Sequence, residues 1–415
     1  MNVLNFRNNP HIKKVFGYFL GDVLNKAIPL LTLPYVANSV SETAFGSYSM
    51  GHLFLQFSFA FCVMGVTSKV ILDVVKDKEW RSSFISSLLV VLLNGCILLS
   101  LLFTTLNLNI FNLHDLGIND SDFFYLIICG MLQSFFAINL ARYQAKGNVL
   151  TYSLLQFSHT VLYFSLLIIV VEKQMIEDIW ALLSLVNATV LLLHGYCIYR
   201  DKVIKNITFP LYFENMRFAL FQLPHVMSSW LRLGYDRLIL ASQIGLVAVA
   251  GYSAALQIGL TVSIIVMSFN KFWSPFILKR LHDNKTTNNI VGYAVLGLVI
   301  LCVLCSLLGM LAIEYLLPES YKPFKLVVPI ICMAYSFQGA YFLIVNYLHF
   351  FEKSYLLSIP SVLSVAIHVC IAPILIGQYQ SFGAAYSLLT SWFLLFLITF
   401  ILVKYHQNKR QFNES

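Results

Sequence analysis

The sequence contains few charged residues. Only 11% of its 415 residues are Asp, Glu, Lys or Arg, while 59% are hydrophobic. A soluble domain carries about 25% charged residues, so this composition could not cover the surface of a 47.1 kDa soluble globule. It excludes a soluble enzyme and intrinsic disorder. The mean hydropathy of +0.77 instead indicates a membrane protein with many spans.

Motifs of common catalytic and metal sites are also lacking. There is no P-loop, no Gly-x-Ser-x-Gly nucleophile motif and no His-Glu-x-x-His zinc motif. Cys302 and Cys305 form a Cys-x-x-Cys pair without further ligands, and all eight cysteines lie in apolar runs, where free Cys packs as a small hydrophobe. We therefore expect no enzyme activity, no cofactor and no metal.

Apolar runs of helix length predict an all-α integral membrane protein with about 12 transmembrane helices, because one span needs ~20 apolar residues. The first run contains Asp22 and Lys26 and continues to Val36, so it is a span and not a cleavable signal peptide. The predicted helices cover residues 15–37, 45–68, 84–106, 122–141, 149–171, 179–199, 213–240, 245–270, 289–314, 325–349, 355–376 and 382–403.

Basic residues are distributed unevenly between the two sides of these helices. The N-terminus and the loops after even-numbered helices hold 21 Lys and Arg, whereas the opposite side holds only Lys173, Lys322 and Lys325. The positive-inside rule therefore predicts that both termini are cytoplasmic. The same rule explains the net charge of +8, so we expect no nucleic-acid partner. No loop is large enough for a folded domain, and we expect the protein to act within the membrane.

Charged residues interrupt the first predicted helix, which contains Asp22, Asn25 and Lys26. Counted from Lys14, they lie ~12–18 Å deep, near the midplane of the bilayer. Asp22 and Lys26 are four residues apart and can pair on one helix face. An ionisable group at this depth is costly and marks a candidate functional site.

The seventh predicted helix contains Arg232, Asp236 and Arg237. Arg232 lies ~22 Å beyond Arg217, in the outer half of the membrane, and Arg232 and Asp236 are again four apart. With Lys26, the interior holds three cations and two acids, and this surplus of positive charge predicts an anion-binding cavity. The alternative is that the charges form structural ion pairs, or that Arg237 extends to the membrane surface.

Features of the first and seventh helices recur at corresponding places. Pro29 and Pro34 interrupt the first and Pro224 the seventh, and interrupted helices at matching places point to a transporter binding site. Gly-Tyr-Ser at 251–253 repeats the similar 46–49 segment about 205 residues later. We therefore predict two six-helix lobes, 1–205 and 206–415, related by a parallel pseudo-repeat.

Other polar residues in the spans are explained by structural roles as well as by functional ones. Five histidines lack metal-ligand spacing and are expected to be packing residues, with His225 beside Pro224 as the one of interest. Amide side chains either line an aqueous path or form hydrogen bonds between helices. The histidines are His159, His194, His225, His349 and His368, and the amides include Gln56, Asn139, Gln156, Gln222, Gln338 and Asn346.

These residues together resemble a known family. The segments 19–35 and 44–49 are similar to the opening helices of Wzx-type flippases, which carry O-antigen and other polysaccharide repeat units. Trp230 with the segments 236–240, 251–253 and 272–276 resembles the seventh and eighth helices of the same family. The resemblance covers essentially the whole chain. The Asp-Arg pair followed by Gly-Tyr-Ser is its most specific part.

The resemblance implies the fold of the multidrug/oligosaccharidyl-lipid/polysaccharide (MOP) exporters, with two lobes facing a central cationic cavity. It implies a flippase that moves undecaprenyl-pyrophosphate-linked oligosaccharide from the cytoplasmic to the periplasmic leaflet of the bacterial inner membrane. Alternating access coupled to an ion gradient would drive this step. Partners implied are membrane lipid, a polysaccharide polymerase and a chain-length regulator.

Roles for the charged residues follow from the resemblance. Lys26 and Arg232, with Asn25, would bind the anionic head group, since burying a pyrophosphate is very costly unless it is paired. Asp22 and Asp236 would hold these cations or exchange protons or cations, and Arg237 would form a gate or an ion pair. Cations at inner helix ends would recruit the pyrophosphate or serve as ordinary membrane anchors: Lys69 (where relatives often have Arg), Arg142 and Lys271.

Three alternatives compete with the flippase. A membrane glycan polymerase or ligase would need a large outer loop with catalytic basic residues, and here the outer loops are short. A multidrug or cation antiporter of the same fold would need acidic residues to bind cations, whereas this interior has a surplus of bases. A purely structural scaffold would leave the buried charges without a use.

Overall fold

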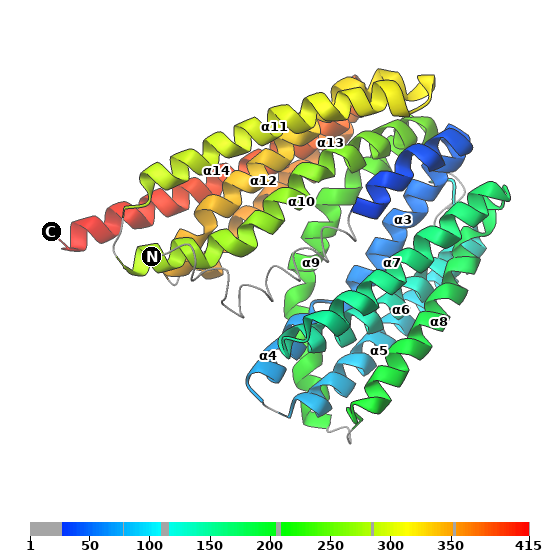
Figure 1. Ribbon diagram of the computed structural model, residues 1–415, viewed down its shortest axis with the longest axis horizontal. Helices are drawn as coiled ribbons and strands as arrows, with labels where there is room; N and C mark the ends of the chain where they lie inside the picture. The colour runs from blue at the N-terminus through cyan, green and yellow to red at the C-terminus, as the bar shows by residue number, and fades with distance from the viewer. Residues whose placement is uncertain are drawn as a thin grey trace. The chain divides into compact units, whose positions relative to one another are not determined.

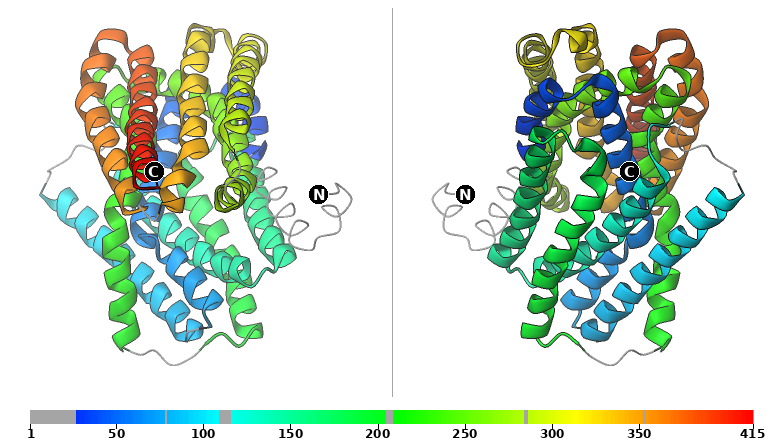
Figure 2. Two further views of the ribbon diagram at one scale, coloured as in Figure 1. Left: turned by 90° about the vertical axis from the view of Figure 1, so that its left-hand side faces the viewer. Right: turned by 90° about the vertical axis from the view of Figure 1, so that its right-hand side faces the viewer.

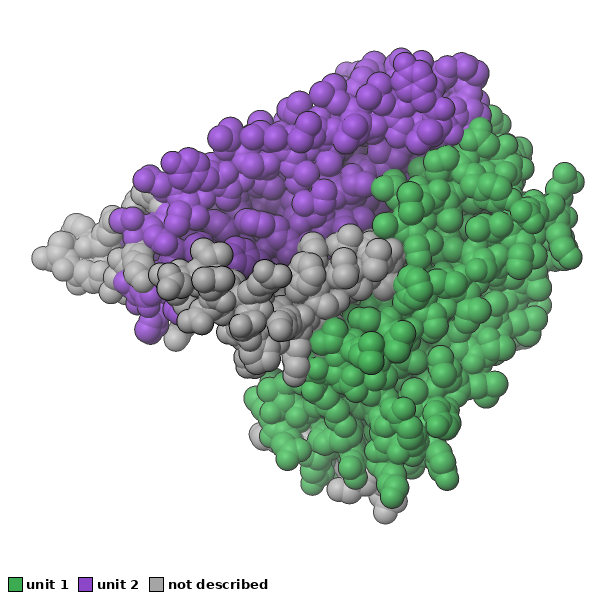
Figure 3. Space-filling model, viewed as in Figure 1, with its two compact units in different colours: residues 1–230 green, residues 231–415 purple. Residues whose placement is uncertain are grey.

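The computed structural model describes residues 27–77, 79–108, 116–204, 209–283, 286–351 and 354–414. These residues form helices and turns, without a strand (Figure 1, Figure 2). They divide into two compact units, Met1–Trp230 and Leu231–Ser415 (Figure 3). The all-α architecture predicted from the apolar runs is confirmed.

The first unit contains a helix over residues 27–39, followed by helices that end with the first part of α9. These are α3 (Glu42–Val63), α4 (Val66–Val75), α5 (Trp80–Asn107), α6 (Asp120–Ala145), α7 (Val149–Glu172), the 3-10 helix η2 (Ile176–Asp178), α8 (Ile179–Arg200) and α9 (Phe209–Gln243). The second unit contains the rest of α9, α10 (Leu246–His282), α11 (Asn288–Leu316), η3 (Glu319–Leu326), α12 (Val327–Phe350), η4 (Ser354–Leu357), α13 (Ser358–Tyr379) and α14 (Ser381–Glu414).

Nine of the described helices are long and apolar enough to cross a membrane, or ten if the bent pair of α3 and α4 is one span. Helix 27–39 is too short over the described residues, and α9 is interrupted by charges. With these two, the described helices number twelve when α3 and α4 count as one. The predicted total of twelve spans stays a prediction.

The second predicted helix, 45–68, is wrong as a single element. The chain breaks at Met64 and Gly65, whose φ angles are 39° and 77°, and α3 and α4 meet there at 45°. Glycine adopts this left-handed conformation without the strain of a side chain. A single glycine inside an apolar run is also tolerated in continuous helices, so Gly65 alone did not predict the break.

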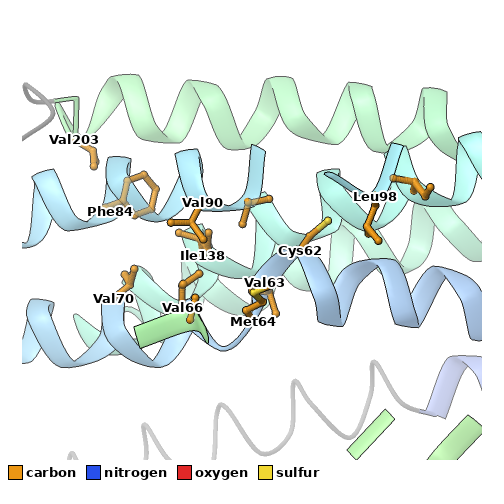
Figure 4. Packing of buried hydrophobic residues seen from close by; sticks show 13 residues of the cluster. Cys62, Val63, Met64, Val66, Val70, Phe84, Val90, Leu98, Ile138 and Val203 are labelled. Atoms are coloured by element: carbon orange, nitrogen blue, oxygen red, sulfur yellow. The ribbon is translucent and has the colours of Figure 1, made fainter. Parts of the chain in front are cut away.

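A hydrophobic cluster surrounds this break and fixes its geometry (Figure 4). Cys62 and Val66, on either side of it, are fully buried. Phe84 from α5 and Ile138 from α6 complete the cluster from neighbouring helices, and both are fully buried as well. Van der Waals packing is what associates helices in lipid, so this close-packed cluster holds the bent pair together as one unit.

Each unit has one helix with many neighbours, α6 in the first unit and α12 in the second; each is the fourth helix of its set when α3 and α4 count as one. In the first unit α6 packs against α3, α5 and α8; in the second α12 packs against α10, α11 and α14. The helices thus occupy equivalent chain positions in the two sets, and this shared order of contacts favours the predicted repeat. Gly130 permits the closest of these approaches, because a Cβ there would lie 2.7 Å from the backbone nitrogen of Phe59 on α3.

Two helices extend beyond their predicted ends. α10 continues through Pro275 to His282 instead of ending at residue 270, and α14 reaches Glu414 instead of residue 403. The final segment is rich in Lys, Gln and Arg, which are good helix formers, so loss of hydrophobicity there does not end the helix. The apolar pattern located the spans, but it did not fix where each helix stops.

Candidate functional site

Three of the predicted site residues, Asp22, Asn25 and Lys26, lie outside the described residues. The other predicted residues lie on four different helices: Arg232, Asp236 and Arg237 on α9, Lys69 on α4, Arg142 on α6 and Lys271 on α10. The structure brings Arg232, Asp236 and Arg237 together in the second unit. It places Lys69 and Arg142 in separate polar clusters of the first.

Arg232 is a buried cation surrounded by hydroxyl groups. Its side chain is 5% exposed, its Nε donates to Ser391 Oγ at 3.1 Å, and its Nη2 donates to Ser364 Oγ at 2.7 Å. Nη2 also lies 3.3 Å from the Ser361 carbonyl, and the guanidinium stacks 4.6 Å from the centre of the Trp392 ring. Among the described residues no carboxylate forms an ion pair with it. Its charge is therefore solvated by neutral dipoles and a π face.

Asp236 lies one turn further along α9 and has its own set of partners. It is 2% exposed, and its two oxygens accept hydrogen bonds from Ser387 Oγ at 2.6 Å and Tyr252 Oη at 3.1 Å. His368 Nε2 lies 3.5 Å from Oδ1. A buried carboxylate needs such donors, because an uncompensated charge in a low dielectric is very costly.

Arg237 completes the charged group on α9. It is 8% exposed, and its Nη2 donates to the carbonyl of Leu233 at 3.1 Å. Its Nε has no hydrogen-bond partner among the described residues. The predicted gate or ion-pair role of Arg237 stays a prediction, since the side chain is held here by its own helix.

Two polar layers arise because three helices each repeat a polar residue after four positions. Arg232 and Asp236 on α9 face Ser364 and His368 on α13. On α14, Ser391 lies in the Arg232 layer and Ser387 in the Asp236 layer. Four residues advance a helix by about 6 Å, a little more than one turn. The cationic and anionic layers are therefore neighbours but have separate partners.

Lys69 is buried at 7% exposure and is compensated by two carboxylates. Its Nζ lies 2.9 Å from Asp73 and 2.8 Å from Glu214, which is on the first part of α9. Asp73 accepts a further hydrogen bond from Ser83 Oγ at 2.6 Å. This ion network ties α4, α5 and α9 together within the first unit.

Arg142 is fully buried near the end of α6, with its Nη2 3.1 Å from Asp201 Oδ2. Asp201 follows α8 and lies outside the candidate span. Partial burial raises the pKa of Asp201. Hydrogen bonds from Tyr143 and Arg200 and the charge of Arg142 together lower it by more than burial raises it, so the pKa of Asp201 lies below its ordinary value. Lys271 is exposed on α10.

A polar cavity lies inside the first unit. It measures about 230 Å³ and is bordered by helix 27–39, α3, α6 and α7. Its polar lining comes from His52, Gln56, Gln133, His159 and Tyr163, together with hydrophobic rings. The described lining contains no carboxylate, Lys or Arg. Such a wall offers neutral hydrogen-bond donors and acceptors, and Gln56 in it lies 3.1 Å from His52 Nδ1 on its own helix.

Sequence reasoning missed most partners of the α9 charges. Ser364, Ser387 and Ser391 carry no distinctive motif, and His368 was grouped with packing histidines while His225 was the one of interest. His225 is exposed, whereas His368 faces Asp236. The recurrence of Ser and His at four-residue spacing, at 364/368 and 387/391, was the available signal. Among the described residues no group of three His, Cys, Asp or Glu could hold a metal ion.

Comparison with known proteins places the chain in a family. The sequence profile described as "Polysaccharide biosynthesis protein" matches residues 11–281. An uncharacterized membrane protein of Haemophilus influenzae is 24% identical over 372 residues, which are 86% of this chain and 88% of that protein. The Lsg locus putative protein 1 of the same organism is 23% identical over 363 residues, 85% of this chain and 88% of its own length.

Solved structures show the same fold. An inward-facing multidrug resistance MATE family transporter of the MOP superfamily superimposes with a TM-score of 0.70 at 11% identity, covering 95% of this chain and 100% of the other. A MOP superfamily transporter from Pyrococcus furiosus, described as having a binding pocket of reverse polarity, gives a TM-score of 0.65 at 12% identity, covering 95% of both chains. Since the family profile matches well over half of the sequence, this multi-pass membrane protein belongs to the polysaccharide biosynthesis protein family and has the fold of MOP-superfamily transporters.

Proposed function

We propose that this protein is a flippase for undecaprenyl-pyrophosphate-linked oligosaccharide. It moves surface-polysaccharide repeat units, such as O-antigen units, from the cytoplasmic to the periplasmic leaflet of the bacterial inner membrane. Alternating access of the two lobes, 1–205 and 206–415, around a central cationic cavity performs the step, and an ion gradient drives it. Both termini are cytoplasmic, and a polymerase and chain-length regulator act on the product.

The observation that carries this proposal is the state of Arg232. It is buried, and no described carboxylate neutralises it. Contacts with the serines and the tryptophan ring offset part of the desolvation free energy of the Arg232 guanidinium, and an anionic ligand would offset the rest. Its Nη1 makes no hydrogen bond with the described residues, so a guanidinium donor is available for a phosphate oxygen. In this proposal Lys26 and Asn25 bind the same head group.

The remaining cations receive secondary roles. Lys69 and Arg142 already have carboxylate partners, so they recruit pyrophosphate only when those ion pairs open. Lys271 is exposed and can attract phosphate at the membrane surface. Asp22 holds Lys26 in place. Arg232 is therefore the residue on which substrate binding depends most directly.

The cavity of the first unit supports sugar as the second part of the cargo. At about 230 Å³ it is smaller than the ~300–1,000 Å³ pockets that enclose drug-sized ligands. Hydroxyl groups of a sugar can be met by Gln56, Gln133 and the histidines.

The proposal is tested in a strain that lacks this gene and retains its own glycan pathway. Surface glycan is measured together with the leaflet of the lipid-linked repeat unit, which is scored in spheroplasts by access to a membrane-impermeant label. We expect loss of surface glycan with units trapped inside, restored by the wild type but not by Arg232→Ala at equal expression. Arg217→Gln, which removes an exposed arginine from the same helix, is the matched control and should restore export.

The competing enzyme gives a different result. If single units reach the outer leaflet in the deleted strain but are not joined into polymer, the protein is a polymerase or ligase and the flippase proposal fails. Restoration by Arg232→Ala to the wild-type level would instead refute the cationic site. The two readouts therefore separate the function from the residue assigned to it.

A further inference from the structure

We infer that Asp236 and His368 form a proton-binding site in the second unit, and that the proton is the ion that drives transport. This inference rests on the proposed function for its coupling role, but the site itself can be tested without cargo. It adds His368, which the sequence did not single out, and it names the coupling ion.

His368 is fully buried on α13, and its surroundings leave it without an ordinary partner. Neither ring nitrogen makes a hydrogen bond with the described residues. The nearest acceptor is Asp236 Oδ1, 3.5 Å from Nε2. A buried polar ring normally has a hydrogen-bond partner, because an unsatisfied buried nitrogen is costly. A proton on Nε2 would convert this approach into a charge-assisted hydrogen bond after a small movement.

The charges that face this pair are few. On α9 they are Arg237 and the phenol of Tyr235, whose ring lies 6.3 Å from that of His368. α10 contributes Tyr252 and α12 contributes Tyr335, while α14 contributes only the neutral Ser387. Tyrosine ordinarily titrates near pH 10 and arginine above 12. Asp236 and His368 are therefore the two side chains placed to share an exchangeable proton.

A proton suits this site better than a metal cation. Sodium, like other hard cations, needs several oxygen ligands around it. Here both Asp236 oxygens already accept hydroxyl hydrogens, and the other near groups, Arg237 and His368, are cationic or nitrogen ligands. No second carboxylate joins Asp236 among the described residues.

The position of the pair explains how a proton could affect the cargo. His368 and Ser364 are four apart on α13, as are Ser387 and Ser391 on α14, so the helices that hold the pair also hold Arg232. Gain or loss of one charge about 6 Å along these helices changes the forces on the Arg232 layer. Proton binding at the pair and anion binding at Arg232 would then be coupled through α9, α13 and α14, which hold both sites.

The test is side-chain nitrogen NMR of the full-length protein, labelled with ¹⁵N-histidine, in nanodiscs between pH 5 and 8. His368→Gln or His368→Asn, whichever folds as judged by thermal unfolding, identifies the His368 signals. We expect these signals to change from the protonated to the neutral form across this range in the wild type. In Asp236→Asn they should stay neutral, because the carboxylate that stabilises the imidazolium is gone.

A buried histidine in the same spectra provides the control. His194 is 2% exposed, its Nδ1 lies 3.0 Å from Asn139 Nδ2, and none of the described carboxylates forms an ion pair with it. Its signals, identified with His194→Gln, should keep one form throughout. If His368 also keeps one form, or if replacing KCl with NaCl abolishes its change, the proton site is refuted.

Coupling is tested separately by export. At equal expression His368→Gln should reduce surface glycan several-fold in the deleted strain. If His368 titrates but this variant exports like the wild type, the pair is not the coupling site. Failure of the flippase proposal would leave the NMR result unchanged, so the two failures can be told apart.

Discussion

Arg232 and Asp236 lie four residues apart on α9, yet neither is the other's ion partner. Arg232 donates hydrogen bonds to Ser364 and Ser391. Asp236 accepts hydrogen bonds from Ser387 and Tyr252, and His368 lies 3.5 Å from it. Opposite charges at this spacing usually stabilise a helix by pairing. Under the proposed function, this separation leaves Arg232 available for an anionic ligand and Asp236 available for a proton.

Loss of the serine acceptors around Arg232 should destabilise the second unit. Ser364→Ala removes the acceptor of its shortest hydrogen bond, and a bond to a charged group contributes about 1.5–3 kcal/mol. We expect a loss of this size in the free energy of unfolding, measured by denaturant titration in detergent. Ser228→Ala is the control, because this exposed hydroxyl bonds only the Pro224 carbonyl of its own helix. Equal losses in both variants would contradict the role of Ser364.

The two carboxylates of Lys69 should differ in importance. Lys69→Met leaves Asp73, which is 3% exposed, with a serine as its remaining donor, and breaking a buried pair in this way costs about 3–5 kcal/mol. The Glu214 side chain is 59% exposed, so Glu214→Gln should cost less than about 1 kcal/mol. Thermal unfolding of the single and double variants checks this order. A larger effect of Glu214→Gln would show that the exposed pair dominates.

Two glycine substitutions should have opposite outcomes. A Cβ at Gly130 would lie 2.5 Å from Ser58 Cβ and 2.7 Å from backbone of α3, so Gly130→Ala must separate α3 from α6 and cost about 1–3 kcal/mol. At Gly195, on α8, a Cβ meets nothing within 4 Å. Gly195→Ala should stabilise the helix by about 0.5–1 kcal/mol. Unfolding of both variants in the same detergent tests the contrast.

Asp201 should make stability depend on pH in the acid range. Its pKa is lower in the folded protein than in the unfolded chain, so the folded state binds the proton less readily. The stabilisation is present above the unfolded pKa of about 3.9 and is lost as pH falls through the folded pKa. The difference in unfolding free energy between wild type and Asp201→Asn should therefore shrink below about pH 4. A difference that is constant from pH 3 to 6 would contradict this.

The sequence predicted the fold well because the thickness of the membrane sets the length and apolar composition of each spanning helix. α7, with bounds Val149–Glu172, was predicted as 149–171, and α8 as 179–199. The break at Met64 and Gly65 was not predicted, since it depends on tertiary contacts such as Gln222 against Gly65. The hydropathy pattern does not reveal the backbone conformation of a single glycine, so it could not predict the break.

The candidate site was predicted only in part. Charged residues such as Arg232 and Asp236 stand out in a span because their burial is costly. Ser364 and Ser391 do not stand out, because a serine in a span commonly bonds its own helix. Which histidine meets a carboxylate depends on how α9 and α13 are rotated against each other. That rotation is a property of packing, and single-sequence patterns do not contain it.

The first part of α9 has a consequence for synthesis of the protein. Lys69 donates to Glu214, Asn215 donates to the Ser83 carbonyl and to Ser87 Oγ, and the Trp230 indole donates to the Leu53 carbonyl at 3.2 Å. All these partners are made more than 120 residues after the groups that they satisfy. Because a chain is inserted from its N-terminus, the earlier helices of the first unit reach the bilayer before these partners exist. The packing of the unit is completed only when residues 209–230, its own last segment, have been synthesised.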